Sequence, residues 1–143
     1  MGREIFTIDT YRATITPVVR GRASNDFTMW CYSEILEKRG IRHRYEVFID
    51  PTNPGGSLIY WRPTSGSFER RIIVVLNMTA EQIDRTYNLL STEKPVRMRI
   101  EHEGGVLLDE TDSSDWDRIN DLKIYTGSEP VGEAEDDREV LPE

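Results

Sequence analysis

The chain has 143 residues, 37% of them hydrophobic and 31% charged, which suffices for one core and excludes a wholly disordered chain. A single cysteine, Cys31, excludes an internal disulfide, and the longest apolar run is far too short to span a membrane. The first residues lack the apolar stretch of a signal peptide, so we expect a cytoplasmic protein with no membrane partner.

Charge is distributed unevenly along the sequence, whose net charge is −8. Residues 1–99 hold 15 basic and 11 acidic side chains, whereas residues 100–143 hold 3 basic and 15 acidic ones. Residues 128–143 carry seven acids and few large apolar residues, which predicts a disordered acidic tail after a single domain over 1–127. A basic body joined to an acidic end favours a homo-oligomer or a partner of opposite charge.

Alternating apolar and polar residues predict an extended segment over 4–19. A helix is predicted over 27–39, because Phe27, Cys31 and Ile35 recur at the four-residue spacing of a helical stripe. Three further apolar residues widen that stripe beyond what one packed side needs: Met29, Tyr32 and Leu36. These three residues are therefore predicted to form an interface.

The middle of the chain reads as strands followed by a helix. Residues 41–50 alternate cleanly, and 58–62 with 68–76 read as a hairpin. The continuously apolar end of that hairpin is expected at the centre of the sheet. Thr79 opens a capping-box sequence that ends at Gln82, and apolar residues then follow at helical spacing.

The last third begins with an alternating strand over 96–103, followed by a Gly-Gly turn into 106–108. A short helix over 113–121 and a final strand over 122–125 complete the prediction. The fold class that follows is α+β, with a mostly antiparallel sheet of about 6–8 strands and two main helices packed on one face.

Few residues in the sequence suit catalysis. The histidines are His43 and His102, and the thiol is Cys31. His43 lies on the inward face of its predicted strand, so we expect it to be buried and hydrogen-bonded, and Cys31 is expected to act as a small hydrophobe. A Cys31–His43 nucleophilic pair is the alternative. We predict no catalytic residue and no cofactor, and an enzyme built on carboxylates and tyrosine stays the least favoured function.

Five carboxylates lie between Asp109 and Asp117. They could hold a hard cation, but their spacing does not match a calcium-binding loop. We expect no metal, and instead a solvated segment with helix-capping acids. Three of these carboxylates are predicted interface residues: Asp112, Asp115 and Asp117.

Arginine pairs on strands are the second candidate site. Their members are two residues apart and so share one side of a sheet: Arg42 with Arg44, and Arg97 with Arg99. On neighbouring strands, four guanidinium groups would bind phosphates, and Trp61, with Tyr60 and Phe48, would stack on bases. Salt bridges to Glu46, Glu69 and Glu101 are the alternative explanation.

The leading functional hypothesis is a non-enzymatic binding module that acts by protein–protein contact, for example as an inhibitor or accessory protein. The alternative is a binder of a phosphorylated small molecule, such as a nucleotide, or of nucleic acid through an arginine-bearing sheet face.

Overall fold

The computed structural model describes residues 2–15, 27–51, 56–64, 69–105 and 116–126, and within them the chain is mostly β-strand. The strands are β1 (Gly2–Ile15), β2 (Phe27–Ser33), β3 (Leu36–Lys38), β4 (Ile41–Ile49), β5 (Leu58–Pro63), β6 (Arg70–Leu76), β7 (Val96–His102) and β8 (Trp116–Thr126). One helix, α1 (Ala80–Thr92), accompanies them in the described part.

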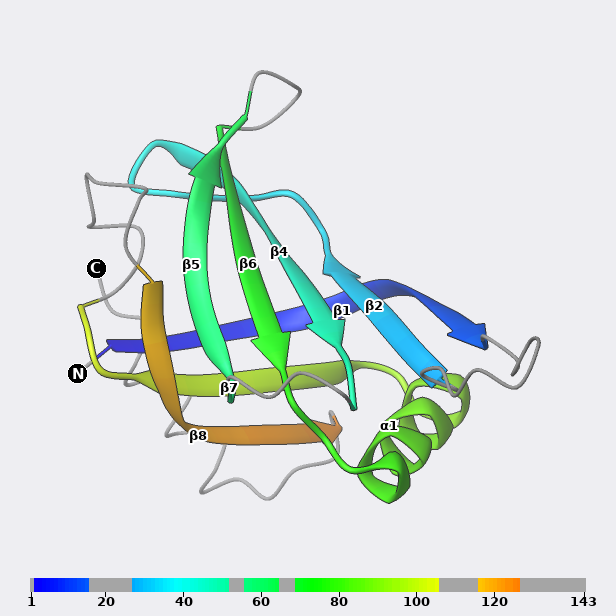
Figure 1. Cartoon of the computed structure of the whole chain (residues 1–143). Helices are drawn as coiled ribbons and strands as arrows, with labels where there is room; N and C mark the ends of the chain where they lie inside the picture. Colours follow the sequence, from blue (N-terminus) through cyan, green and yellow to red (C-terminus); the bar gives the residue numbers. More distant parts are fainter. Residues whose placement is uncertain (1, 16–26, 52–55, 65–68, 106–115, 127–143) are drawn as a thin grey trace.

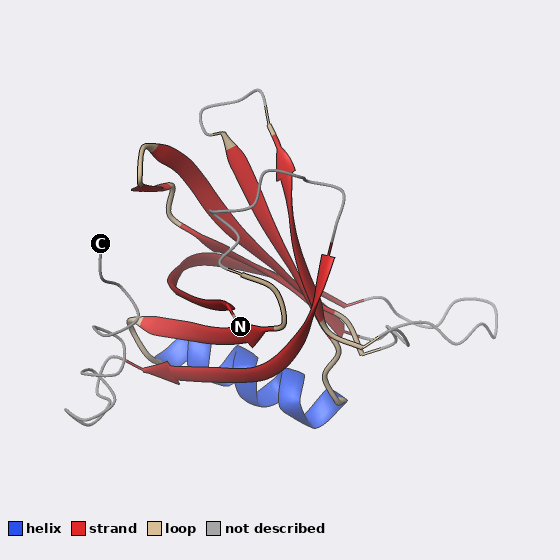
Figure 2. Ribbon diagram, turned by 90° about the vertical axis from the view of Figure 1, so that its left-hand side faces the viewer, coloured by secondary structure: helices blue, strands red, loops and turns tan. Residues whose placement is uncertain are grey.

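Seven of these strands close into a barrel in the order β2-β1-β7-β8-β5-β6-β4, which pairing between β2 and β4 completes. β3 lies outside the ring as a short hairpin partner of β4. The pair β4–β6 is parallel, and the other strand pairs among the described residues are antiparallel. β5, β6 and β4 run side by side (Figure 1), and the strands curve around a common interior (Figure 2).

The core fills the barrel interior, because alternate residues of each strand point inward. In β7 every second residue from Val96 to His102 is buried, and β2 buries Met29, Cys31 and Ser33. The fully buried members of the core include Met29, Val47, Ile59, Ile72, Met98 and Ile100. The expected central strand is β6, where four of the five residues 72–76 are buried.

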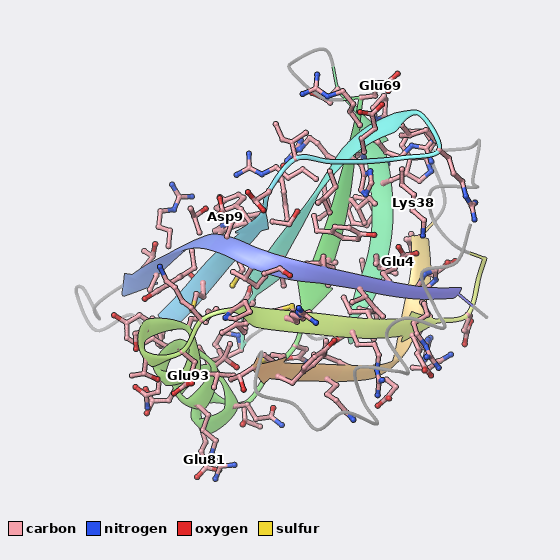
Figure 3. All side chains as sticks on the ribbon, turned by 180° about the vertical axis from the view of Figure 1, so that it is seen from behind. Glu4, Asp9, Lys38, Glu69, Glu81 and Glu93 are labelled. Carbon is pink, nitrogen blue, oxygen red and sulfur yellow. The ribbon has the colours of Figure 1, made fainter. Side chains whose placement is uncertain are left out.

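Helix α1 covers one end of the barrel (Figure 1), as the Thr79 capping box predicts. The Thr79 side chain accepts a hydrogen bond from the Gln82 backbone N–H at 3.1 Å, and Gln82 accepts one from the Thr79 N–H at 3.0 Å. Ile83 and Leu90 join the core, whereas Glu81 in the first turn points away from the barrel (Figure 3). Within the described residues, no helical segment has the length and hydropathy to cross a membrane.

The predicted α+β class with two main helices is wrong: residues 27–33 and 36–38 form β2 and β3 instead of a helix. Both sides of β2 are apolar, with Met29 inside and Trp30 outside, so its residues satisfy helical and strand spacing together. The short helix predicted over 113–121 is also wrong from residue 116 onward, where β8 begins. The hairpin partner 106–108 and the acidic tail 128–143 lie outside the described residues.

Candidate functional site

A chain of hydrogen bonds crosses the barrel interior between four strands. His102 on β7 bonds through Nε2 to Glu4 on β1 at 2.9 Å, and through Nδ1 to Asp117 on β8 at 2.8 Å. Tyr45 on β4 donates its hydroxyl proton to the other Glu4 oxygen at 2.7 Å. We call these four residues the Glu4–His102 network; Figure 3 labels Glu4 on β1.

His102 is the positive centre of this network. Both ring nitrogens face carboxyl groups, and an ionised carboxylate only accepts hydrogen bonds, so this geometry favours an imidazole that is protonated on both nitrogens and charged. Burial alone would lower the pKa of His102, but the hydrogen bonds and charges of Glu4 and Asp117 outweigh burial and raise it. Because His102 and Glu4 are almost fully buried and mutually bonded, the network is suited to holding strands together.

Cys31 and His43, the two residues considered for nucleophilic chemistry, are each buried in the barrel. His43 is 3% exposed and donates from Nδ1 to the Ile41 carbonyl at 3.0 Å, which confirms its expected burial and hydrogen bonding. Burial lowers the pKa of His43. Cys31 is fully buried, and burial raises the pKa of its thiol to about 12, so the thiolate needed for attack is not formed at neutral pH.

The outer surface of β2, β4, β6 and β5 carries a second, apolar layer that is separate from the core. One cross-strand row consists of Trp30, Phe48, Val75 and Leu58. The next row, extended onto β8, consists of Tyr32, Glu46, Ile73, Tyr60 and Trp116. Together these nine residues are called the aromatic face. Six of the nine are half-buried. Ile73 and Glu46 are buried, and Trp116 is 56% exposed.

Three arginines border the aromatic face in register. Arg44 on β4 pairs with Arg71 on β6, and Arg71 pairs with Arg62 on β5. We call these three the arginine row. Arg71 bonds the Glu46 carboxylate at 2.9 and 3.1 Å.

The other two members of the arginine row lie over aromatic rings. Arg44 lies 4.8 Å from the Tyr32 ring centre, and Arg62 lies 4.8 Å from that of Tyr60. The planar guanidinium groups of Arg44 and Arg62 thus cover aromatic rings, and their positive charges lie at the border of the aromatic face.

The predicted arginine pairs do not form one surface. Arg42 and Arg44 lie on β4, but Arg97 and Arg99 lie on β7, and other strands separate β4 from β7 in both directions around the ring. The neighbours that complete a row with Arg44 are Arg71 and Arg62. The acids proposed as salt-bridge partners do form contacts: Glu46 binds Arg71, Glu101 binds Arg3, and Glu69 accepts from the Arg42 backbone N–H.

Trp61, the predicted stacking residue, points into the barrel and is 8% exposed. The Arg70 guanidinium lies over its ring at 3.7 Å from the centroid. Its indole Nε1–H is buried and has no acceptor among the described residues. A buried ring of this kind cannot stack on a base at the surface, whereas Tyr60 and Phe48 do lie on the outer side.

The predicted interface residues are scattered. Met29 is fully buried in the core and Leu36 packs against the core from β3, so only Tyr32 of that trio lies on the aromatic face. Asp117 belongs to the Glu4–His102 network, and Asp112 and Asp115 lie outside the described residues.

Sequence reasoning missed Glu4 and Trp30. The alternation of Glu4, Phe6 and Ile8 was a signal that Glu4 points inward, and a strand reading of 27–33 would have placed Trp30 beside Tyr32.

Comparison of the chain with protein-family models, curated proteins and solved structures gives no match. Among the described residues, no group of three or more potential ligand side chains is placed to hold a metal ion.

Proposed function

We propose that this protein is a non-enzymatic binding module, an inhibitor or accessory protein in character, that contacts a protein partner through the aromatic face. The observation that carries the proposal is the second apolar layer on β2, β4, β6 and β5. Its residues lie outside the barrel core; six of them are only half-buried and Trp116 is exposed, so the fold leaves part of this apolar layer open to solvent. Apolar side chains gathered on one outer surface are typical of a docking site.

The composition of the aromatic face supports a protein partner. Trp, Tyr and Phe, bordered by Arg, are the residues enriched in protein interfaces and in the few positions that dominate binding energy. Trp116 is the most exposed large hydrophobic residue in the described chain, at 56%, and it stands in register with Tyr60. A partner that covers Trp116 would remove its exposed ring from water.

The arginine row favours one second candidate, a phosphorylated small molecule or a nucleic acid. Three guanidinium groups in register can bind phosphates, and such binding would weaken steeply with salt. The separation of Arg97 and Arg99 from this row reduces the cationic surface that the sequence predicted.

The proposal is tested by affinity purification from the cells that make the protein, comparing Trp116→Arg with Thr7→Arg. Thr7 is exposed on the outer side of β1, so its variant adds the same charge away from the aromatic face. We expect the first variant to lose its co-purifying protein and the second to retain it, with unchanged urea unfolding in both. Retention of the same partners by both variants would contradict the proposal.

A further inference from the structure

Arg44 in the arginine row carries positive charge that no carboxylate among the described residues neutralises. Neighbouring strands are about 4.8 Å apart, so three aligned arginines repel one another. Glu46 bonds Arg71, but Arg44 contacts two neutral groups in the described chain: the Ser33 carbonyl, at 3.2 Å, and the Tyr32 ring. Arg62 is exposed at the end of the row. An occupant of the aromatic face would therefore gain from carboxylates along this border.

The backbone of these strands is already paired, which restricts how a partner can bind. β6 pairs with β4 over 70–76 and with β5 over 70–75. β4 pairs with β6 on one side and with β3 and β2 on the other. A partner cannot add a strand at this position, since strand addition needs a free sheet edge. Recognition must use side chains.

The spacing of the rows matches a helix laid across the strands. Along each strand, the arginine row lies two residues, or about 6.7 Å, from the adjoining row of the aromatic face, which there consists of Glu46, Ile73 and Tyr60. Across the strands the arginines recur at about 4.8 Å, close to the 5.4 Å pitch at which one flank of a helix repeats its side chains. An extended segment repeats same-side residues only every 6.7 Å or so, and would miss one arginine in three.

We infer that the partner presents an amphipathic α-helix that lies across β4, β6 and β5, with Asp or Glu side chains on the flank that meets the arginine row. Its apolar side covers Tyr60 and Ile73. This inference rests on the proposed function, and it names the partner's chemistry.

Single-stranded nucleic acid fits the surface less well, because bases need open ring faces. Tyr32 stacks with Trp30 at 6.2 Å and also carries the Arg44 guanidinium. Tyr60 carries the Arg62 guanidinium, and Phe48 packs on Trp30 with ring centres 4.7 Å apart. Apart from Trp116, these rings therefore offer edges more than open faces, and one open ring suits an apolar side chain better than a run of stacked bases.

The test places the photo-crosslinking amino acid benzoylphenylalanine at Trp116, with the same residue at Thr7 as the control, in cells that make the protein naturally. Crosslinked peptides are identified by mass spectrometry. We expect the position 116 crosslink to fall in an acidic, amphipathic, helical segment of one protein. Crosslinks to an extended or basic segment, or to nucleic acid, would overturn the inferred helix. A position 116 that captures no protein beyond those captured at position 7 would overturn the proposed function itself.

The crosslinked segment is then synthesised and titrated against the intact protein and three variants: Arg44→Gln, Arg62→Gln and Arg85→Gln. Arg85 is an exposed helix residue, 76% exposed in its side chain, and serves as the matched charge control. We expect each of the first two variants to weaken binding by roughly tenfold and the control to leave it unchanged. Equal affinity for all four proteins would overturn the pairing of acids with the arginine row, even if the segment binds the aromatic face.

Discussion

Glu4 and His102 are 98 positions apart in the chain, yet Glu4 Oε2 and His102 Nε2 meet at 2.9 Å inside the barrel. Asp117 bonds the other nitrogen of the same imidazole, and Tyr45 bonds the other oxygen of the same carboxylate. The network thus joins β1, β4, β7 and β8. Because its charges are buried, each member depends on the others to offset its loss of hydration.

Replacement of Glu4 by Ala should lower the free energy of unfolding by about 3–5 kcal/mol, because it leaves the His102 imidazolium and the Tyr45 hydroxyl without their carboxylate. Urea unfolding followed by tryptophan fluorescence measures the change. Glu101→Ala is the control: Glu101 pairs with Arg3 at 2.7 Å on the barrel exterior, and loss of that pair should change stability by less than about 1 kcal/mol. Similar losses of unfolding free energy in both variants would show that the buried network stabilises the fold no more than an exterior ion pair does.

Stability should fall as pH rises above 6.5, the ordinary pKa of histidine. The folded chain raises the pKa of His102, so it binds that proton more tightly than the unfolded chain. The stabilisation is therefore complete below pH 6.5 and is lost as pH rises through the raised pKa. Urea midpoints measured across this range give the slope.

His43 provides the contrast within the same titration. Burial lowers the pKa of His43, so its contribution to stability is lost as pH falls below 6.5, in the opposite direction. His102→Gln should remove the loss of stability above pH 6.5 and leave the loss below pH 6.5, which His43 causes, unchanged. An alkaline slope that persists in His102→Gln would assign the effect to another group.

Gly104 is required by the space around Asp117. A Cβ at Gly104 would overlap the Asp117 carboxylate and push it away from His102. Gly104→Ala should therefore cost about 1–3 kcal/mol, measured by thermal or urea unfolding. Gly40→Ala is a useful comparison: nothing lies within 4 Å of a Cβ there, and the only penalty is its φ of +79°. A pH profile flattened by Gly104→Ala but not by Gly40→Ala would trace the effect to the network.

Cys31 should resist alkylation by iodoacetamide in the native protein and react promptly in denaturant. The side chain is fully buried and burial raises its pKa to about 12, so both access and thiolate are lacking. Mass spectrometry after timed labelling reads the result. Rapid native labelling at neutral pH would mean that β2 opens often enough to expose its inner side.

Local sequence signals predicted much of the strand and helix content. The Thr79 capping box gave α1, and the alternation from Val96 to His102 gave β7, because both depend on neighbours a few residues away. Arg39 and Gly40, with φ of 56° and 79°, form the two-residue turn between β3 and β4. Gly40 directly follows the helix predicted over 27–39, and it fits either structure because a helix end and a tight hairpin turn both favour a left-handed residue.

Barrel closure could not be read in this way. The pairing of Met29 with Ile49 that closes the ring has no local signature, and β2 is apolar on both sides, which imitates a helix. That imitation placed Met29 at an interface. β5 is also apolar on both sides, with Tyr60 outside and Trp61 inside, so Trp61 was predicted at a surface although it points inward. Of the arginine row, the sequence predicted only Arg44 as a site residue, because Arg44, Arg71 and Arg62 come from three strands whose register has no local signature.

The position of β1 in the ring constrains synthesis of the protein. β1 lies between β2 and β7, and Glu4 bonds His102, which follows it by 98 positions. While a ribosome is still making the chain, β1 can pair with β2, but its other edge stays open until residues 96–102 have emerged. The nascent chain therefore carries an open strand edge, and a Glu4 that has not yet met His102, until that point, and we expect its risk of aggregation to be greatest during that interval.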